Sequence, residues 1–96
     1  MILSFGDAAT DDLYHGRQTS RVRRFPQPIL PVVLRKLDML AAAHTLNDLR
    51  SPPGNHLEAL KGNLEGFYSI RINDQWRVVF RWETGGAHQV RVTDYH

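Results

Sequence analysis

The sequence predicts an α+β domain in which two N-terminal helices pack on one face of a small, mostly antiparallel sheet. Two observations on patterning lead to this expectation. Apolar residues recur at helical spacing in the first half of the chain, and they alternate as in strands in the second half, after a proline-rich breaker at residues 51–55. The length of 96 residues suits one domain, which we expect to span residues 1–96.

The N-terminal half predicts a short strand followed by two helices. Residues 2–5 form a strand candidate that can add at one edge of the sheet. Asp7 is suited to cap a helix over residues 8–15, and Gly16 is suited to end it. A second helix is predicted over residues 28–44, where prolines cluster at the start. Its expected core stripe consists of Leu30, Val33, Leu34, Leu37, Leu40 and Ala41.

The C-terminal half predicts three strands joined by tight turns, at residues 67–72, 76–82 and 87–94. Sequential antiparallel strands of this kind form a meander. Alternation places one apolar set of side chains toward the helices. This set consists of Tyr68, Ile70, Ile72, Trp76, Val78, Phe80, Trp82, Val90 and Val92.

The opposite side of the predicted sheet is polar and rich in arginine. Its expected members are Ser69, Arg71, Arg77, Arg81, Gln89, Arg91, Thr93 and, if the last strand continues, Tyr95. A solvated face is the common outcome for an antiparallel sheet. Four arginines with no acid beside them would repel one another, however, and an anionic ligand would relieve this repulsion. A groove for a phosphate backbone is therefore the second interpretation.

The composition limits the classes of function. The formal net charge is only +2, yet residues 13–37 carry six basic side chains and no acidic one. The absence of cysteine excludes disulfides and thiolate metal sites, and no two of the five histidines have the i, i+4 spacing of a helical metal site, so we expect no metal and no cofactor. No apolar run reaches transmembrane length and no signal-peptide pattern opens the sequence, so we expect a cytoplasmic protein without membrane contact.

Several side chains could support chemistry without a metal. Arg77 and Lys61 could stabilise negative charge. The candidates for proton transfer are His56, Glu58, Tyr95 and His96. Each also has a structural interpretation: Arg77 as a surface strand residue, Lys61 as a loop charge, Tyr95 as a core aromatic, and His96 as an inert terminal residue.

Four segments in order carry a resemblance to a known family. They are DLRSPPGN at 48–55, LEALKG at 57–62, YSIRINDQWRV at 68–78 and VTDYH at 92–96. Together they resemble the HigB branch (host-killing, or plasmid maintenance killer, proteins) of the RelE/ParE superfamily of toxins, which belong to type II toxin–antitoxin systems. The resemblance covers nearly the whole chain and implies a RelE-like β-α-α-β-β-β fold.

The resemblance also implies an activity and a set of partners. We expect a metal-independent, ribosome-dependent endoribonuclease that cleaves mRNA in the ribosomal A site and so inhibits translation. The implied partners are the ribosome with its rRNA, mRNA, and a HigA-like helix-turn-helix antitoxin. Operator DNA is expected as a partner only through the antitoxin complex. The alternatives are a toxin of the same fold that acts on another target such as DNA gyrase, and a non-catalytic RNA-binding module.

Site residues follow by position from the resemblance. Lys61, Arg77 and Tyr95 match active-site residues of the family, and His96 matches a functional terminal histidine. Some relatives carry a histidine where Glu58 stands, so the general base is left open among Glu58, His56, Tyr95 and His96. RNA-binding roles are expected for Arg50, Arg71, Arg81 and Arg91. Replacement of Arg77 by alanine is expected to abolish most cleavage and to keep the fold, because an exposed strand arginine packs little.

Overall fold

A four-stranded sheet forms the centre of the computed structural model, which describes residues 1–94. The strands are β1 (Glu58–Ala59), β2 (Phe67–Arg71), β3 (Trp76–Glu83) and β4 (Gly86–Asp94). They pair in chain order, and every pair is antiparallel. The predicted meander is therefore confirmed. Strand β1 was not predicted, since two residues are too few to show a periodic pattern.

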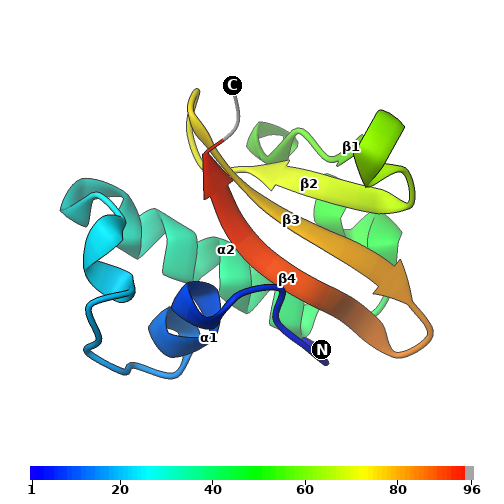
Figure 1. The fold of residues 1–96 in the computed structure, drawn as a ribbon. Helices are drawn as coiled ribbons and strands as arrows, with labels where there is room; N and C mark the ends of the chain where they lie inside the picture. Colours follow the sequence, from blue (N-terminus) through cyan, green and yellow to red (C-terminus); the bar gives the residue numbers. More distant parts are fainter. Residues whose placement is uncertain (95–96) are drawn as a thin grey trace.

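Helices α1 (Ala8–Tyr14) and α2 (Leu30–Ala42) lie on the same side of this sheet, as expected (Figure 1). Asp7 caps α1, where its carboxylate accepts a hydrogen bond of 2.8 Å from the backbone N–H of Thr10. Gly16 follows the helix with a left-handed φ of 73°, a conformation that glycine adopts without steric cost. Within residues 1–94, no helix is both long and apolar enough to cross a membrane.

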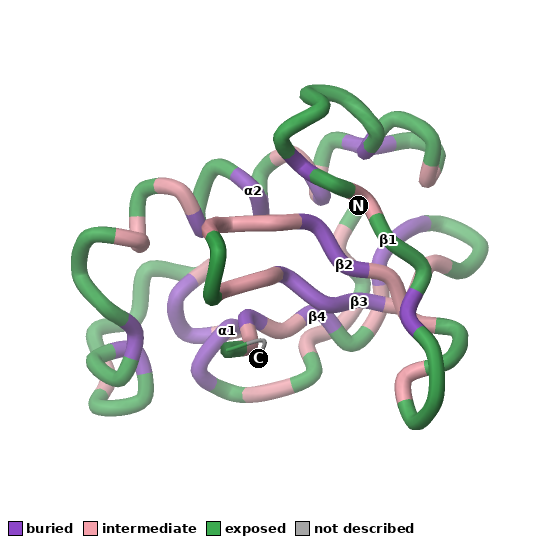
Figure 2. Tube along the Cα trace, turned by 90° about the horizontal axis from the view of Figure 1, so that it is seen from above, coloured by how far each residue is buried: buried purple, intermediate pink, exposed green. Residues whose placement is uncertain are grey.

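The core lies between α2, α1 and the inner face of the sheet, and Figure 2 shows the buried stretches gathered on the central strands. Leu37, Leu40 and Phe80 are fully buried there. The predicted stripe on α2 was wrong at one position, because Leu34 remains 37% exposed. Lys36 takes the place in the stripe instead, with only 8% of its surface exposed. The buried positions 33, 36, 37 and 40 follow the i, i+3, i+4, i+7 pattern of one helix face.

The N-terminal segment runs parallel to β4 and pairs with it only through isolated bridges, Ile2 to Ala87 and Phe5 to Val90. The predicted edge pairing is thus present, although no continuous strand forms. Two glycines permit the close approach. A Cβ atom on Gly86 would lie 2.1 Å from the carbonyl oxygen of Met1, and one on Gly6 would lie 2.7 Å from that of Gln89.

A bulge interrupts the pairing of β3 with β4 between Val79 and Arg81. Strand β4 has one extra residue there, and Gln89 adopts a φ of 53°. As a result His88, and not Gln89, lies opposite Arg81. The strict alternation that placed Gln89 among the polar side chains was wrong beyond this point, because a bulge shifts the alternation by one residue.

Candidate active site

The side of the sheet that faces away from the helices carries the predicted polar residues. In antiparallel strands, residues directly opposite one another point to the same side. Arg77 lies opposite both Arg71 and Thr93, and Ser69 lies opposite Glu58. Below, this side is called the polar face. Its polar members are Glu58, Ser69, Arg71, Arg77, Arg81, His88, Arg91 and Thr93, and the apolar Phe67 and Val79 lie on the same side.

Arg77 is held by three groups that surround its guanidinium. Its Nε donates a hydrogen bond of 2.8 Å to Ser69 Oγ, and its Nη2 donates one of 2.7 Å to the backbone carbonyl of His56. Its Nη1 lies 3.7 Å from Glu58 Oε1. Only 12% of the side chain is exposed. The expectation of an exposed, loosely packed arginine was therefore wrong, because a neighbouring loop and β1 cover it.

Acidic groups lie beside most arginines of the polar face, which corrects the expected unrelieved repulsion. Arg71 pairs with Asp74 in the following turn, and Arg77 lies near Glu58. Arg81 Nε lies 3.4 Å from Glu83 Oε1. Arg91 is different: its Nε atom is buried and has no hydrogen-bond partner among residues 1–94. The sequence did not reveal these pairs: Asp74 lies in the turn after β2, Glu58 in the unpredicted strand β1, and Glu83 at the end of β3.

The carbonyl that holds Arg77 belongs to a residue in an unusual conformation. His56 follows the short 3₁₀ helix η4 (Pro53–Asn55) and adopts φ 44° and ψ 56°, the left-handed region. Non-glycine residues seldom occupy this region, so the surrounding structure must hold it. Its backbone carbonyl thereby reaches Arg77 across 21 residues of sequence.

Asn55 anchors this loop from within the protein. Its side chain is fully buried and donates to the carbonyls of Leu49 at 3.1 Å and Ser51 at 3.3 Å. Its Oδ1 accepts a hydrogen bond from Lys36 Nζ. Burial lowers the pKa of Lys36, and the nearby charge of Arg35 lowers it further. The network therefore joins α2 to the loop that positions His56, and through it to Arg77.

The structure brings together some predicted site residues and leaves others apart. Glu58 and Arg77 are neighbours on the polar face. Lys61 is exposed one residue before the 3₁₀ helix η5 (Gly62–Leu64), and its side chain makes no hydrogen bond or ion pair within residues 1–94. Arg50 is exposed at the end of the 3₁₀ helix η3 (Leu46–Arg50), outside the sheet. Tyr95 and His96 lie outside the described residues.

Two contributors to the site were missed at the sequence level. The sequence indicated the imidazole of His56 as a candidate group and gave no sign of a role for its backbone carbonyl. Ser69 was placed on the correct face without a role, although its hydroxyl is the acceptor for Arg77 Nε. The sequence pattern did not show that Ser69 would be buried among the side chains of the polar face. No sequence signal marks a left-handed histidine beyond its position after Pro-Gly-Asn.

The arrangement places a fixed cation and a carboxylate side by side on the polar face. A guanidinium whose orientation is already fixed by hydrogen bonds can stabilise a nearby anion without further ordering. Glu58 is about half exposed, with 53% of its side chain accessible, so it can accept a proton from a bound group. Among residues 1–94, no group of three or more histidine, aspartate or glutamate side chains could hold a metal ion.

Comparisons with known proteins show the family of the chain. Residues 2–96 match the HigB-like toxin family, described as RelE-like toxins of the type II toxin–antitoxin system HigB. Toxin HigB-1 of Vibrio cholerae is 44% identical over 87 residues, which cover 91% of this chain and 90% of that protein. A protein named endoribonuclease HigB, from Proteus vulgaris, is 40% identical over 40 residues, or 42% of this chain and 44% of that protein.

Solved structures at low sequence identity share the fold. The YoeB–YefM complex of Staphylococcus aureus contains a chain that superimposes with a TM-score of 0.61 at 19% identity, covering 100% of this chain and 98% of that one. YafQ of E. coli gives a TM-score of 0.59 at 13% identity, covering 98% of this chain and 91% of that one. The fold and the family match agree over nearly the full length, and the chain therefore belongs to the HigB-like family of RelE-like toxins of type II toxin–antitoxin systems.

Proposed function

We propose that this toxin is a ribosome-dependent endoribonuclease that cleaves mRNA in the A site and thereby inhibits translation. The observation that carries the proposal is the fixed guanidinium of Arg77, with Glu58 beside it, on an arginine-rich face of the sheet. The name of the Proteus vulgaris relative, endoribonuclease HigB, supports the same activity. We expect it to act in the cytoplasm and without a metal cofactor.

In the proposed mechanism, the 2′-OH of the RNA loses a proton and its oxygen attacks the adjacent phosphorus, while the 5′-oxygen leaves and gains a proton. Arg77 stabilises the negative charge that develops on the phosphorane-like transition state. Glu58 can accept the 2′-OH proton, since it lies beside the guanidinium that would hold the phosphate. Tyr95, His96 and His56 are the other candidates for proton transfer, and Lys61 supplies a second positive charge.

Substrate orientation is assigned to the ribosome in this proposal. Holding the mRNA in a reactive geometry can supply a large part of the rate enhancement, so the toxin needs only a few catalytic side chains of its own. Arg50, Arg71, Arg81 and Arg91 are proposed contacts to RNA phosphates. A HigA-like helix-turn-helix antitoxin is the proposed inhibitor, and operator DNA would be bound only by the complex of the two proteins.

Cleavage mapping with an Arg77 variant tests the proposal. The purified protein is incubated with mRNA, with and without translating ribosomes, and the 5′ ends are mapped. We expect cuts within codons that require ribosomes, and a loss of about 100-fold or more in rate for Arg77→Ala, the usual effect of removing one donor from a developing oxyanion.

The controls separate chemistry from folding. Arg77→Ala leaves the Ser69 hydroxyl and the His56 carbonyl without their partner, so a loss of about 1–3 kcal/mol in stability is expected and must be measured by thermal unfolding. Arg35→Ala, an exposed arginine on α2, is the matched variant and should cleave normally. Intact mRNA on translating ribosomes would reject the proposal in favour of a gyrase target or of binding without cleavage.

A further inference from the structure

A cavity of about 440 Å³ opens at the corner of the molecule where β4 ends. Below, it is called the corner pocket. Its lining residues are Asp7, Arg24, Phe25, Trp76, Arg91, Val92, Thr93 and Asp94. Pockets of this size accommodate small organic ligands or parts of larger ones. Neither Arg77 nor Glu58 lines the pocket, which shares only Arg91 and Thr93 with the polar face.

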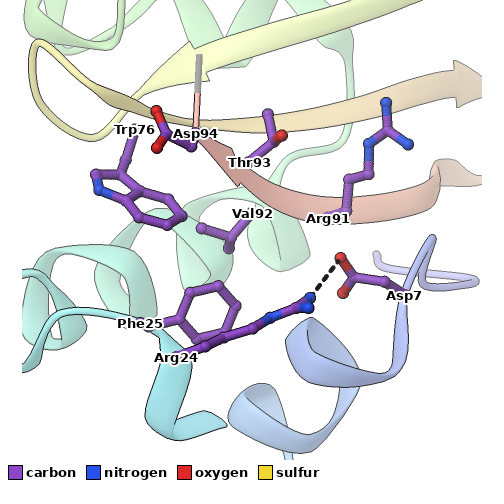
Figure 3. Close-up of a pocket in the computed structure, with 8 residues that line it drawn as sticks. All are labelled: Asp7, Arg24, Phe25, Trp76, Arg91, Val92, Thr93 and Asp94. Atoms are coloured by element: carbon purple, nitrogen blue, oxygen red, sulfur yellow. Dashed lines mark ion pairs between the residues drawn. The ribbon is translucent and has the colours of Figure 1, made fainter. Parts of the chain in front are cut away.

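The walls of the pocket combine an apolar side with a charged pair. Figure 3 shows Trp76, Phe25 and Val92 gathered on the side of β4 that faces the helices. The ring of the half-buried Trp76 meets that of the buried Phe25 edge-on, with centroids 5.9 Å apart. Aromatic surface that is open to a pocket is what nucleobases stack upon.

The charged pair favours a base over a phosphate. Arg24 belongs to the 3₁₀ helix η1 (Val22–Arg24), and its Nη2 lies 3.6 Å from Asp7 Oδ2 (Figure 3). The carboxylate offsets the positive charge, so a free phosphate gains little here. A guanidinium and a carboxylate side by side instead present donors and acceptors together, which complements the mixed edge of a nucleobase.

The position of the pocket connects it to the polar face. Trp76 precedes Arg77 in β3, and Thr93, which lines the pocket, pairs with Arg77 across the strands. In Figure 3, Arg91 and Thr93 point to the opposite side of β4 from Trp76 and Phe25. Arg91 has the buried Nε without a partner within residues 1–94. An RNA strand that crosses the edge of β4 could place a phosphate near Arg91 and the next base in the pocket.

We propose that the corner pocket binds one nucleobase of the RNA, stacked on Trp76 and contacted at its edge by Arg24 and Asp7. The inference rests on the proposed function in one respect, namely that the RNA lies on the polar face. The inference adds a base-binding subsite on the side of β4 that faces the helices. A purine, as the larger ring system, is expected to bind best because stacking increases with ring area.

Tryptophan fluorescence can test this without ribosomes or cleavage. The chain has two tryptophans, so Trp82→Phe leaves Trp76 as the sole tryptophan, which is excited selectively over the tyrosines. This variant is titrated with 2′-O-methyl RNA tetranucleotides, which lack the 2′-OH needed for cleavage. We expect saturable quenching by the intact tetranucleotide and none by an abasic one with the same phosphates. Equal quenching by the abasic strand would overturn the proposal, as would no quenching by any strand.

Arg24→Gln and Arg23→Gln form a matched pair of variants in the same background. Both arginines are exposed neighbours in η1, but only Arg24 lines the pocket. Loss of the Arg24 charge-assisted contact should weaken binding roughly tenfold, whereas Arg23→Gln should stay within about twofold. Equal effects of the two substitutions would show a general electrostatic attraction and would overturn the proposal. Circular dichroism confirms that each variant is folded.

A third variant and a second ligand complete the test. Asp7→Asn retains an oxygen that can cap α1 but exchanges a carboxylate oxygen for a donor, so it should change which base binds best. An unchanged base preference would contradict the assigned role of Asp7.

Free nucleoside monophosphates should bind more weakly than the tetranucleotide. Equal affinity would mean a site for free nucleotides, which would overturn an RNA subsite. Because none of these readouts is cleavage, a failure of the proposed function leaves them interpretable.

Discussion

At the residue scale, His56 contributes through its backbone more than through its ring. Its left-handed conformation directs the carbonyl to Arg77 Nη2 at 2.7 Å, while the side chain is exposed. The residue therefore offers two groups to the proposed cleavage, an imidazole that moves a proton and a carbonyl that positions the guanidinium. The geometry favours the second part, in which His56 is a positioning residue.

Substitutions at His56 separate the two parts. Glycine adopts φ 44° without cost and keeps the carbonyl, so His56→Gly should cleave within about threefold of the unmodified toxin. Valine is β-branched and strained there by roughly 1–2 kcal/mol, so His56→Val should shift the carbonyl and lower cleavage by about tenfold or more. Ribosome-dependent cleavage rates are the measurement, with melting temperatures recorded beside them. A glycine variant as inactive as Arg77→Ala would instead assign the base role to the imidazole.

At the scale of elements, the contact of the N-terminal segment with β4 depends on a close backbone approach. The backbone N–H of Ala87 donates to the carbonyl of Met1 at 2.9 Å, and that of Leu3 donates to the carbonyl of Ala87 at 2.8 Å. Gly86 lies directly beneath this pairing and has a φ of 143°. A side chain at this position would occupy the space of the Met1 backbone, so the segment could not stay in place.

We expect Gly86→Ala to reduce the free energy of unfolding by about 1–3 kcal/mol, the usual cost of inserting a methyl group into filled space. Urea unfolding measures this value. Gly54→Ala is the matched control, because a Cβ on Gly54 meets no atom within 4 Å and its change should stay within about 0.5 kcal/mol. A Gly86→Ala protein as stable as the control would show that the N-terminal pairing contributes little.

At the scale of the whole molecule, stability should depend on carboxylates that folding places among donors. Asp12 is buried, with 6% of its surface exposed, and joins α1 to the loop that follows. A hydrogen bond from Thr19 lowers its pKa most, and burial opposes this, while Arg17 and Arg21 lower it further. Backbone hydrogen bonds from Thr45 and His44 similarly lower the pKa of Asp48.

Acid should therefore destabilise the toxin through these groups. A carboxyl whose pKa is lower in the folded state contributes stability above its unfolded value, near 3.8, and loses that contribution as the pH falls through the lower folded value. Asp12→Asn should lower the melting temperature by a few degrees near neutral pH, and it should show a smaller further decrease in acid. Melting curves between about pH 7 and 2 give both values. Parallel decreases in the two proteins would contradict this role for Asp12.

Part of this architecture could be predicted from the sequence, because the relevant forces act locally. The periods of apolar residues predicted α2 and the three strands β2, β3 and β4. The cap at Asp7 and the stop at Gly16 predicted α1, and the cap is confirmed. The motifs shared with HigB toxins predicted the family, which the match over residues 2–96 confirms. Strand alternation placed Arg77 on the polar side of the sheet, since a side chain's face depends on its position within the strand, and the resemblance to HigB toxins made it a candidate active-site residue.

The tertiary structure alone decided what surrounds those side chains. The Glu58 carboxylate and the His56 carbonyl that lie beside Arg77 both come from segments far from it in sequence. The burial of Lys36 in place of Leu34 likewise depends on what packs against α2. The corner pocket likewise forms only where η1, α1 and the ends of β3 and β4 meet. The apolar period of one helix or strand does not show which segments will pack against it. Those contacts depend on the register and packing of the elements in the folded protein.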